Sequence, residues 1–246
     1  MLRQSIYVSS LCLWAVSAMA QEPGENPVAD AAGGEWSGSA ELGATVTSGN
    51  SDTRNLNGKA EALYERARWR HTTRAEALLA SDSGEDTAER YVASYQADYK
   101  KTERSYIYGT VRGEVDKFSG YDYRLSEAVG YGHRFWEAGD KGYFDLEAGP
   151  GLRQSKPEDG VREDEAILRM AAKYRNSWTP TTRFSQDVIV ESGSDNTFTE
   201  SVTGLKVRIN SALAMKLSVT VKHNSSVPID TEKTDTISAI TLVYDF

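Results

Sequence analysis

The sequence predicts an all-β fold, a transmembrane antiparallel β-barrel of about twelve strands with both termini on the periplasmic side. Three observations predict it: extended segments of alternating polarity, connections of alternating length, and aromatic residues at segment ends. The predicted strands are 36–48, 54–65, 69–81, 88–101, 105–117, 124–136, 143–155, 165–178, 183–192, 198–209, 212–223 and 235–246.

Alternating polarity is clearest in residues 212–223. Every second residue from Leu213 to Val221 is apolar, and Lys216 and Lys222 occupy intervening positions. Successive side chains of a strand point to opposite faces, so one face of this strand is apolar and the other carries charge. Lipid outside a barrel and water inside it require this division. Most segments are also long enough to cross a membrane when tilted.

The connections between these segments alternate between longer and shorter stretches. The longer ones are 81–89, 118–123, 155–164, 191–197 and 224–235, and the shorter ones are 101–104, 137–142, 179–182 and 210–212. Long external loops and short periplasmic turns are typical of outer-membrane barrels. A soluble β-sandwich or lipocalin-like barrel in the periplasm, the competing fold, gives no reason for this alternation.

Aromatic residues gather where this topology puts the membrane interfaces, because Trp and Tyr favour the headgroup level. The predicted periplasmic girdle comprises Trp36, Trp69, Tyr99, Tyr106, Phe135, Trp136, Tyr143, Phe144, Trp178, Phe184, Tyr244 and Phe246. A thinner external girdle comprises Tyr91, Phe118, Tyr121, Tyr123 and Phe198.

The first residues are predicted to direct export. Arg3, an apolar stretch and the small residues at 18 and 20 form a signal peptide over 1–20, which places the protein in the cell outer membrane after cleavage. Residues 21–35 are rich in Pro, Gly and acid and read as a flexible periplasmic linker. The barrel then occupies 36–246.

Composition excludes several classes of function. The chain has a formal net charge of −8, which argues against a nucleic-acid partner. Its one cysteine, Cys12, lies in the signal peptide, so the rest of the chain has no thiolate metal site and no cysteine nucleophile. We therefore expect no cofactor.

The last predicted strand is amphipathic up to Tyr244 and Phe246. A terminal aromatic residue on such a strand is similar to the signal that the barrel-assembly machinery reads during insertion. We assign this role to Tyr244 and Phe246.

Two stretches resemble a known family. They are Glu41-Leu42-Gly43 followed by Thr47-Ser48-Gly49-Asn50-Ser51-Asp52-Thr53 and Leu56, and the closing Leu242-Val243-Tyr244-Asp245-Phe246. Both resemble the salt-induced outer-membrane-protein family, domain of unknown function 481. The resemblance implies an outer-membrane location and a link to envelope or salt stress, and it supplies no activity or catalytic residues.

The face opposite the apolar one is predicted to line the lumen. Its principal candidates are Arg112, Glu114, Asp145, Glu147, Arg169, Lys173, Arg175, Lys216 and Lys222. The same face is predicted to carry Arg70, Arg74, Glu76, Arg90, Asp98, Arg124, Arg134, Arg153, Asp187, Lys206 and Arg208. A hairpin centred on Gly160 would place Glu147 opposite Lys173 and Asp145 opposite Arg175, which predicts two cross-strand ion pairs. Basic residues outnumber acidic ones on this face, which favours a mild anion preference.

Two functions fit such an interior. Either the charged ring lines a narrow pore for small polar solutes, or the charges neutralise one another and plug a structural, envelope-stabilising barrel. The sequence favours the pore. Lipid and lipopolysaccharide of the outer membrane are the expected surroundings in both cases.

The sequence favours neither an enzyme nor a metal site. His71, His133 and His223 are isolated in the sequence, and Ser225 and Ser226 beside His223 show no nucleophile–base–orienter spacing. The acidic loop 158–165 lacks the ligand spacing of a calcium loop. We predict no catalytic or metal-binding residue.

Overall fold

The computed structural model describes residues 34–46, 53–117, 119–139, 141–158, 160–227 and 232–246. The predicted signal peptide, most of the predicted linker, and Phe118 lie outside the described residues. None of the described residues forms a helix that could cross a membrane.

Twelve strands make up the described fold, which confirms the predicted number. They are β1 Glu35–Val46, β2 Thr53–Glu65, β3 Trp69–Asp82, β4 Glu85–Lys100, β5 Ser105–Asp116, β6 Tyr121–Glu137, β7 Gly142–Pro157, β8 Glu163–Ser177, β9 Thr182–Ser192, β10 Thr197–Arg208, β11 Leu213–Asn224 and β12 Thr234–Asp245.

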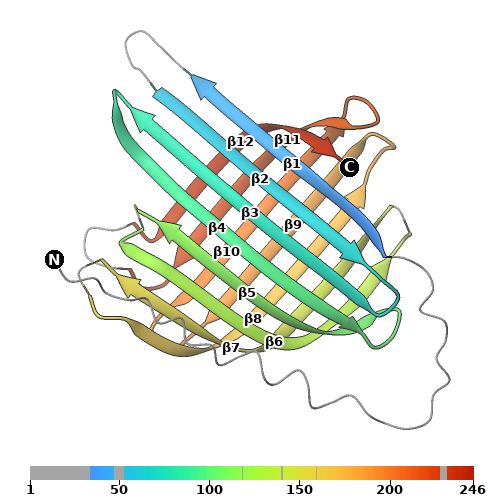
Figure 1. The fold of residues 1–246 in the computed structure, drawn as a ribbon, viewed down its shortest axis with the longest axis horizontal. Helices are drawn as coiled ribbons and strands as arrows, with labels where there is room; N and C mark the ends of the chain where they lie inside the picture. The colour runs from blue at the N-terminus through green and yellow to red at the C-terminus, as the bar shows by residue number, and fades with distance from the viewer. Residues whose placement is uncertain (1–33, 47–52, 118, 140, 159, 228–231) are drawn as a thin grey trace. The chain divides into compact units, whose positions relative to one another are not determined.

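Each strand pairs antiparallel with its sequence neighbours, and β1 pairs with β12, so the sheet closes into a barrel. In Figure 1, the tilted strands β1–β4 run across the front of the barrel and the orange strands cross behind them. We call the end at which β1 starts and β12 finishes the turn end, and the opposite end the loop end. Closure removes the exposed edges that an open sheet would present to lipid.

Three of the predicted long loops are shorter than expected. Four residues, 117–120, separate β5 from β6, and four, 193–196, separate β9 from β10, the same number as in the predicted short turn 101–104. The third is shorter still. Residues 81–89 were expected to form a long connection, but β3 and β4 continue toward each other until only Ser83 and Gly84 separate them. Both residues have positive φ, 52° and 88°, as a two-residue hairpin turn of type I′ requires. The polar residues of this stretch therefore lengthen the hairpin, and the contrast between the loop end and the turn end is weaker than predicted.

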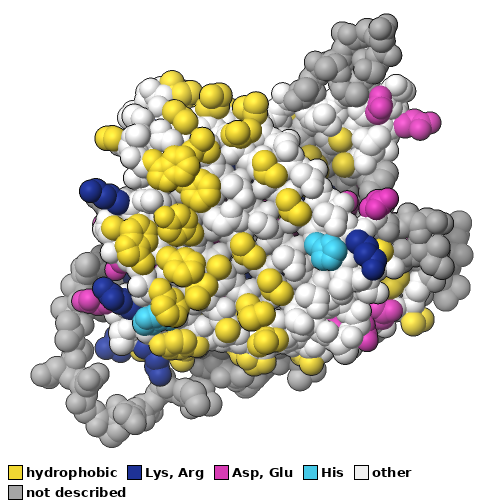
Figure 2. Space-filling view, turned by 180° about the vertical axis from the view of Figure 1, so that it is seen from behind, with side chains coloured by type: hydrophobic (Ala, Val, Ile, Leu, Met, Phe, Trp, Pro, Cys, Tyr) yellow, Lys and Arg dark blue, Asp and Glu magenta, His cyan; other side chains and the backbone are white. Residues whose placement is uncertain are grey.

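The outer face of the barrel is apolar. Exposed large side chains include Leu42, Val129, Leu152, Leu217 and Ile240. Figure 2 shows apolar side chains across the visible wall, with the charged side chains gathered toward its two ends. This distribution is the one that a membrane-spanning barrel requires.

An aromatic girdle surrounds the turn end, with corrections to its membership. Trp36, Phe135, Trp178 and Phe246 are exposed on the outside as predicted. Tyr106 is instead buried in the interior, where its hydroxyl donates to Glu147. At the loop end Tyr91 is exposed, whereas Tyr121 and Phe198 are buried. Phe198 and Tyr121 face arginine guanidinium groups of the interior, so they do not belong to a lipid-facing girdle.

The seam that closes the barrel is shorter than the other strand pairings. β1 pairs with β2 from Glu35 to Val46, but with β12 the directly opposed residues run from Ser39 to Leu42. Reciprocal backbone hydrogen bonds between Gly38 and Phe246, at 2.8 and 3.0 Å, extend the seam toward the turn end. Side-chain contacts across the seam therefore carry more of the closure than they do elsewhere.

Candidate functional site: the barrel interior

The charged residues predicted to line the lumen lie on the inner face and are paired. Two clusters of side chains connect strands that are not neighbours across the interior. A third set of ion pairs lies along the inner wall, on β1–β3 and β8–β12. The first group, the Glu114 cluster, consists of Arg90, Arg112, Glu114, Arg124, Glu200 and Lys222. The second, the Glu147 cluster, consists of Gln96, Tyr106, Glu147, Arg169 and Lys173.

The Glu114 cluster spans the full width of the barrel. Glu114 on β5 accepts a hydrogen bond from Lys222 on β11, and these strands lie on opposite sides of the ring. Arg112 beside it bonds to Glu200 on β10 at 3.0 Å. The side chains of Glu114 and Lys222 are each 2% exposed. Side chains that meet across the lumen in this way close the part of it that lies between β5 and β11.

Pairing with counter-charges stabilises this burial: three carboxylates, of Glu114, Glu200 and Asp116, face the four basic groups of the cluster, with Asp116 3.2 Å from Lys222. Glu114 faces Lys222, Arg90 and Arg112, and a second carboxylate, Glu200, neutralises the two arginines from the other side at 3.0 Å. A buried ion is costly unless a partner and hydrogen bonds compensate it. The cluster meets this condition with groups from β4, β5, β10 and β11.

The Glu147 cluster fills the interior nearer the turn end of β7. The carboxylate of Glu147 accepts from Lys173 at 2.6 Å and from Arg169 at 3.0 Å. Gln96 and Tyr106 each donate to the same carboxylate at 2.9 Å from strands on the far side of β6. The Glu147 side chain is fully buried, at 0% exposure.

The predicted pairing of β7 with β8 is partly wrong. Glu147 and Lys173 do form an ion pair, but Glu147 lies opposite Ala171, and Asp145 lies opposite Lys173. Asp145 instead bonds to Arg134 through both oxygens, at 2.8 and 3.0 Å. Arg175 bonds to Asp187 on β9 at 2.7 Å, so among the described residues Asp145 and Arg175 form ion pairs with other partners and the predicted pair between them is wrong.

The third set, which we call the wall pairs, runs along the barrel wall without crossing the lumen. It consists of Glu41–Lys216, Lys59–Glu76, Glu61–Arg74, Arg175–Asp187 and Lys206–Asp245. Most of these side chains retain contact with solvent; Lys59 and Glu76 are 27% and 32% exposed. Four of the wall pairs are thus more exposed than the buried carboxylates Glu114 and Glu147, whereas Glu41 and Lys216 are about as exposed as the outer members of the clusters.

The strand register places three of these charges in one row. Glu41 lies directly opposite Lys59, and Lys59 lies directly opposite Glu76, across β1, β2 and β3. Lys216 reaches Glu41 from β11 at 2.8 Å and passes Thr241 of β12, its own directly opposed residue. Charges of alternating sign therefore continue across the seam.

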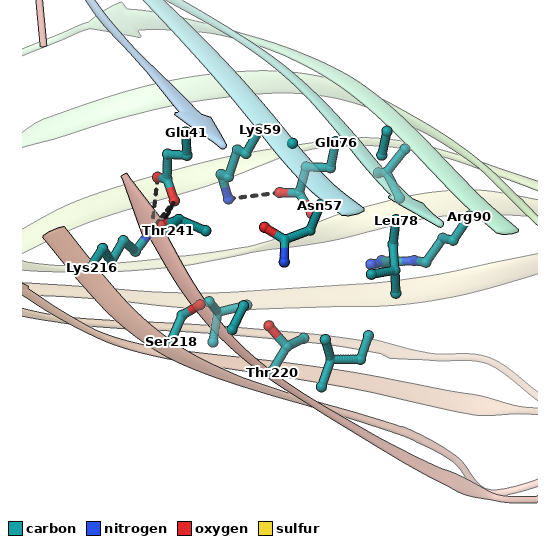
Figure 3. A pocket seen from close by; sticks show the side chains of 16 residues that line it. Glu41, Asn57, Lys59, Glu76, Leu78, Arg90, Lys216, Ser218, Thr220 and Thr241 are labelled. Atoms are coloured by element: carbon teal, nitrogen blue, oxygen red, sulfur yellow. Dashed lines mark hydrogen bonds and ion pairs between the residues drawn. The ribbon is translucent and has the colours of Figure 1, made fainter. Parts of the chain in front are cut away.

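A cavity of about 90 Å³ lies beside this row. Figure 3 shows Glu41, Lys59, Glu76 and Leu78 on one side of it and Ser218 and Thr220 on the other. Its lining comes from β1–β4 and from β10–β12, and includes Asn57, Val92, Val202, Ile237, Ala239 and Thr241. Arg90, which belongs to the Glu114 cluster, also borders it. The cavity is where the interior between these two walls is not filled by side chains.

Sequence reasoning found most of the basic interior residues and missed many of their acidic partners. The omitted interior residues are Glu41, Lys59, Glu61, Asp116, Glu165, Glu191, Glu200 and Asp245. These partners remove most of the basic excess on which the predicted anion preference rests. The alternation rule could have found Glu200, since it lies two residues from the inward-facing Phe198.

The histidines lie away from the interior clusters. His71 stacks with Trp69 in the girdle and bonds to the Tyr95 hydroxyl at 2.7 Å. His133 bonds to Ser105 at 2.9 Å, and His223 bonds to Thr234 at 2.8 Å. Within the described ranges, no group of three His, Cys, Asp or Glu side chains could hold a metal ion. Asp159 of the acidic loop lies outside these ranges.

Tyr244 and Phe246 occupy the turn end beside the seam. Both rings are exposed on the outer face and stack on one another, with centroids 6.2 Å apart. Their assignment as an assembly signal stays a prediction.

A family model described as a protein of unknown function, DUF481, matches residues 40–246. The chain belongs to this family. It is also similar to the uncharacterized protein YdiY of Escherichia coli strain K12, with 28% identity over 214 residues, covering 85% of this chain and 82% of the relative.

Solved structures share the fold of this DUF481 member. The NanC porin matches 85% of this chain and 98% of its own at a TM-score of 0.51, with 10% identity. An outer-membrane channel from Pseudomonas putida F1 matches 91% of this chain and 100% of its own at a TM-score of 0.50, with 12% identity. At these identities the likeness concerns the fold, a closed barrel of the outer-membrane type.

Proposed function

We propose that this chain is a narrow outer-membrane pore for small polar solutes, whose path follows the wall pairs and the cavity beside them. The observation that carries the proposal is the difference in hydration inside the barrel: charged pairs along β2 and β3 remain about one-third exposed, while the central carboxylates of the two clusters are almost fully buried. Charged side chains on the wall of a constriction select what passes. The porin and channel that share the fold support the same class of function.

The proposal includes the location and surroundings of the protein. We expect export through the N-terminal signal peptide, insertion by the barrel-assembly machinery, and contact with phospholipid and lipopolysaccharide. The termini of the barrel then lie on the periplasmic side, at the turn end. A link to salt stress rests on the family resemblance alone.

The second candidate is a plugged barrel that stabilises the envelope without transport. The observation that favours it is the Glu114 cluster, which closes part of the lumen from β5 to β11. It would leave the cavity without a continuous path to both ends.

Planar-bilayer conductance with a matched pair of substitutions separates the two candidates. Ser218 on β11 lines the cavity, whereas Ser238 on β12, which lies opposite the next residue Val219, is exposed on the outer face. We expect the native protein to conduct and Ser218→Trp to lower its conductance by more than about half, since an indole fills a large part of a narrow path. Ser238→Trp is the control and leaves the conductance unchanged.

Absence of conductance from correctly folded native protein would establish the plugged barrel. Equal effects of the two tryptophans would show that ions take another route. Folding is checked by heat-modifiable gel mobility in each case. With the acidic partners included, we also expect a weak ion preference, measured as a reversal potential close to zero in a salt gradient.

A further inference from the structure

The cavity beside the wall pairs has a lining of balanced charge. Lys59 and Lys216 are basic, Glu41 and Glu76 are acidic, and they alternate around one side of the cavity. Arg90, at its border, is already held by Glu114 and Glu200 at 3.0 Å. A solute with a net charge of either sign would meet as much repulsion as attraction here, whereas a solute that carries both charges finds a partner for each.

The rest of the lining is small and largely aliphatic. Leu78, Val202 and Ile237 face an interior that is ionic almost everywhere else, and Ser218 and Thr220 lie beside them. No aromatic side chain occurs among the described residues that line the cavity, so it lacks the ring stacking that commonly holds sugars. The apolar part offers a place for a short aliphatic group, because covering these side chains removes apolar surface from water.

From this juxtaposition we infer that the cavity binds a small zwitterion with an aliphatic body, of the class of an aliphatic α-amino acid. The carboxylate of the solute pairs with Lys59, its ammonium pairs with Glu76, and its aliphatic chain lies against Leu78 and Ile237. As a route for transport, this inference rests on the proposed pore.

Hydration of the Lys59–Glu76 pair makes this exchange possible. The two groups are joined at 2.7 Å and remain about one-third exposed, so separating them costs little. A solute that supplies the opposite charge to each group replaces one pair by two. The same exchange at Glu114 would require separating groups that are dry.

The test is single-channel recording in KCl with L-leucine as the probe. Leucinamide, which is only a cation, 4-methylpentanoate, which is only an anion, and sucrose serve as comparison solutes. We expect leucine to reduce the current in a saturable manner, and the three others to have at most the effect of viscosity. Equilibrium dialysis of radiolabelled leucine against detergent-solubilised protein measures binding independently of conductance.

Two double variants complete the test without changing the net charge. Lys59→Met with Glu76→Gln removes the proposed partners and should weaken leucine binding by about tenfold or more, because hydrogen bonds to charged groups are lost. Arg175→Met with Asp187→Asn removes a wall pair that does not line the cavity and should leave leucine binding in place.

The outcomes separate this inference from the pore. Conductance without leucine binding, or equal binding of leucinamide and 4-methylpentanoate, overturns the zwitterion site and leaves the pore. Leucine binding without conductance supports the site and removes the pore. Should the Lys59/Glu76 variant not fold, the comparison among the four solutes on the native protein decides the question.

Discussion

The Glu114 and Glu147 clusters and the wall pairs use the same residue types in opposite ways. In the Glu114 cluster, charges meet across the lumen between β5 and β11, and in the Glu147 cluster the carboxylate is fully buried against Arg169 and Lys173 of the adjacent strand β8. Along the wall, three of the five pairs join adjacent strands and stay partly exposed, as Lys59 and Glu76 do, and the other two pairs each reach past one strand. The comparison teaches that the number of charges on the inner face does not determine how far the interior is filled: pairing across the barrel fills the level of Glu114, and pairing along the wall leaves the cavity beside Lys59.

The largest expected effect comes from removing the centre of a cluster. Glu147→Ala leaves Arg169 and Lys173 buried without their counter-charge, and we expect a loss of about 3–5 kcal/mol in the free energy of unfolding. The free energy of unfolding is measured by urea titration of the barrel in lipid vesicles, with the folded fraction read from gel mobility.

Glu76→Ala on the wall is the matched control. Its partner Lys59 can return to water, so we expect a loss below about 1 kcal/mol. Similar losses for the two variants would mean that the distinction between dry clusters and wet wall is wrong.

An intermediate effect is expected at the seam. Lys216 bonds to both oxygens of Glu41, at 2.8 and 3.0 Å, across β12, where the backbone pairing is short. Lys216→Met should lower the free energy of unfolding by about 2 kcal/mol, as for a hydrogen bond to a charged group. The temperature at which heat-resistant gel mobility is lost reports it.

Lys206→Met serves as the comparison for the seam. Lys206 bonds to Asp245 at 2.8 Å but is more exposed, and we expect a change within about 0.5 kcal/mol. A Lys206 variant as unstable as the Lys216 variant would contradict a special role for side chains in closure.

The smallest expected effect on stability comes from single cysteine substitutions that compare the access of water to the cavity and to a buried part of the inner face. Thr220 borders the cavity, and Ala171 is buried on the inner face of β8. In protein produced without residues 1–20, and therefore without Cys12, each can be replaced by a cysteine that is the only one in the chain. A water-soluble thiol reagent should label Thr220→Cys quickly and Ala171→Cys far more slowly. Equal rates would show that water reaches both regions.

Much of the fold could be predicted from the sequence because strand alternation is a local property. In β11, apolar residues such as Leu217 alternate with polar ones such as Lys222, so the outer and inner faces can be recognised directly in the sequence. A side chain's face depends on its own position, so Arg112, Glu147 and Lys173 were assigned to the interior without knowledge of their partners.

Partners were less predictable because they depend on where each hairpin turns. Moving the centre of the β7–β8 hairpin by one residue keeps every face but changes every partner by two residues, which is why Asp145 lies opposite Lys173 and not Arg175. Contacts between β5 and β11 could not be predicted at all, since they arise only once the ring is closed.

The short seam also bears on the order of assembly. β1 and β12 are the neighbouring strands with the greatest separation in sequence, so joining them costs more chain entropy than forming any hairpin. The short pairing between β1 and β12 offsets little of this cost, and we therefore expect these two strands to pair last. Until that step, the first eleven strands can form a curved sheet held by adjacent hairpins. Glu41 lies on β1 and Lys216 on β11, so we expect their ion pair to form only when β12 lies between these two strands and to stabilise the closed ring.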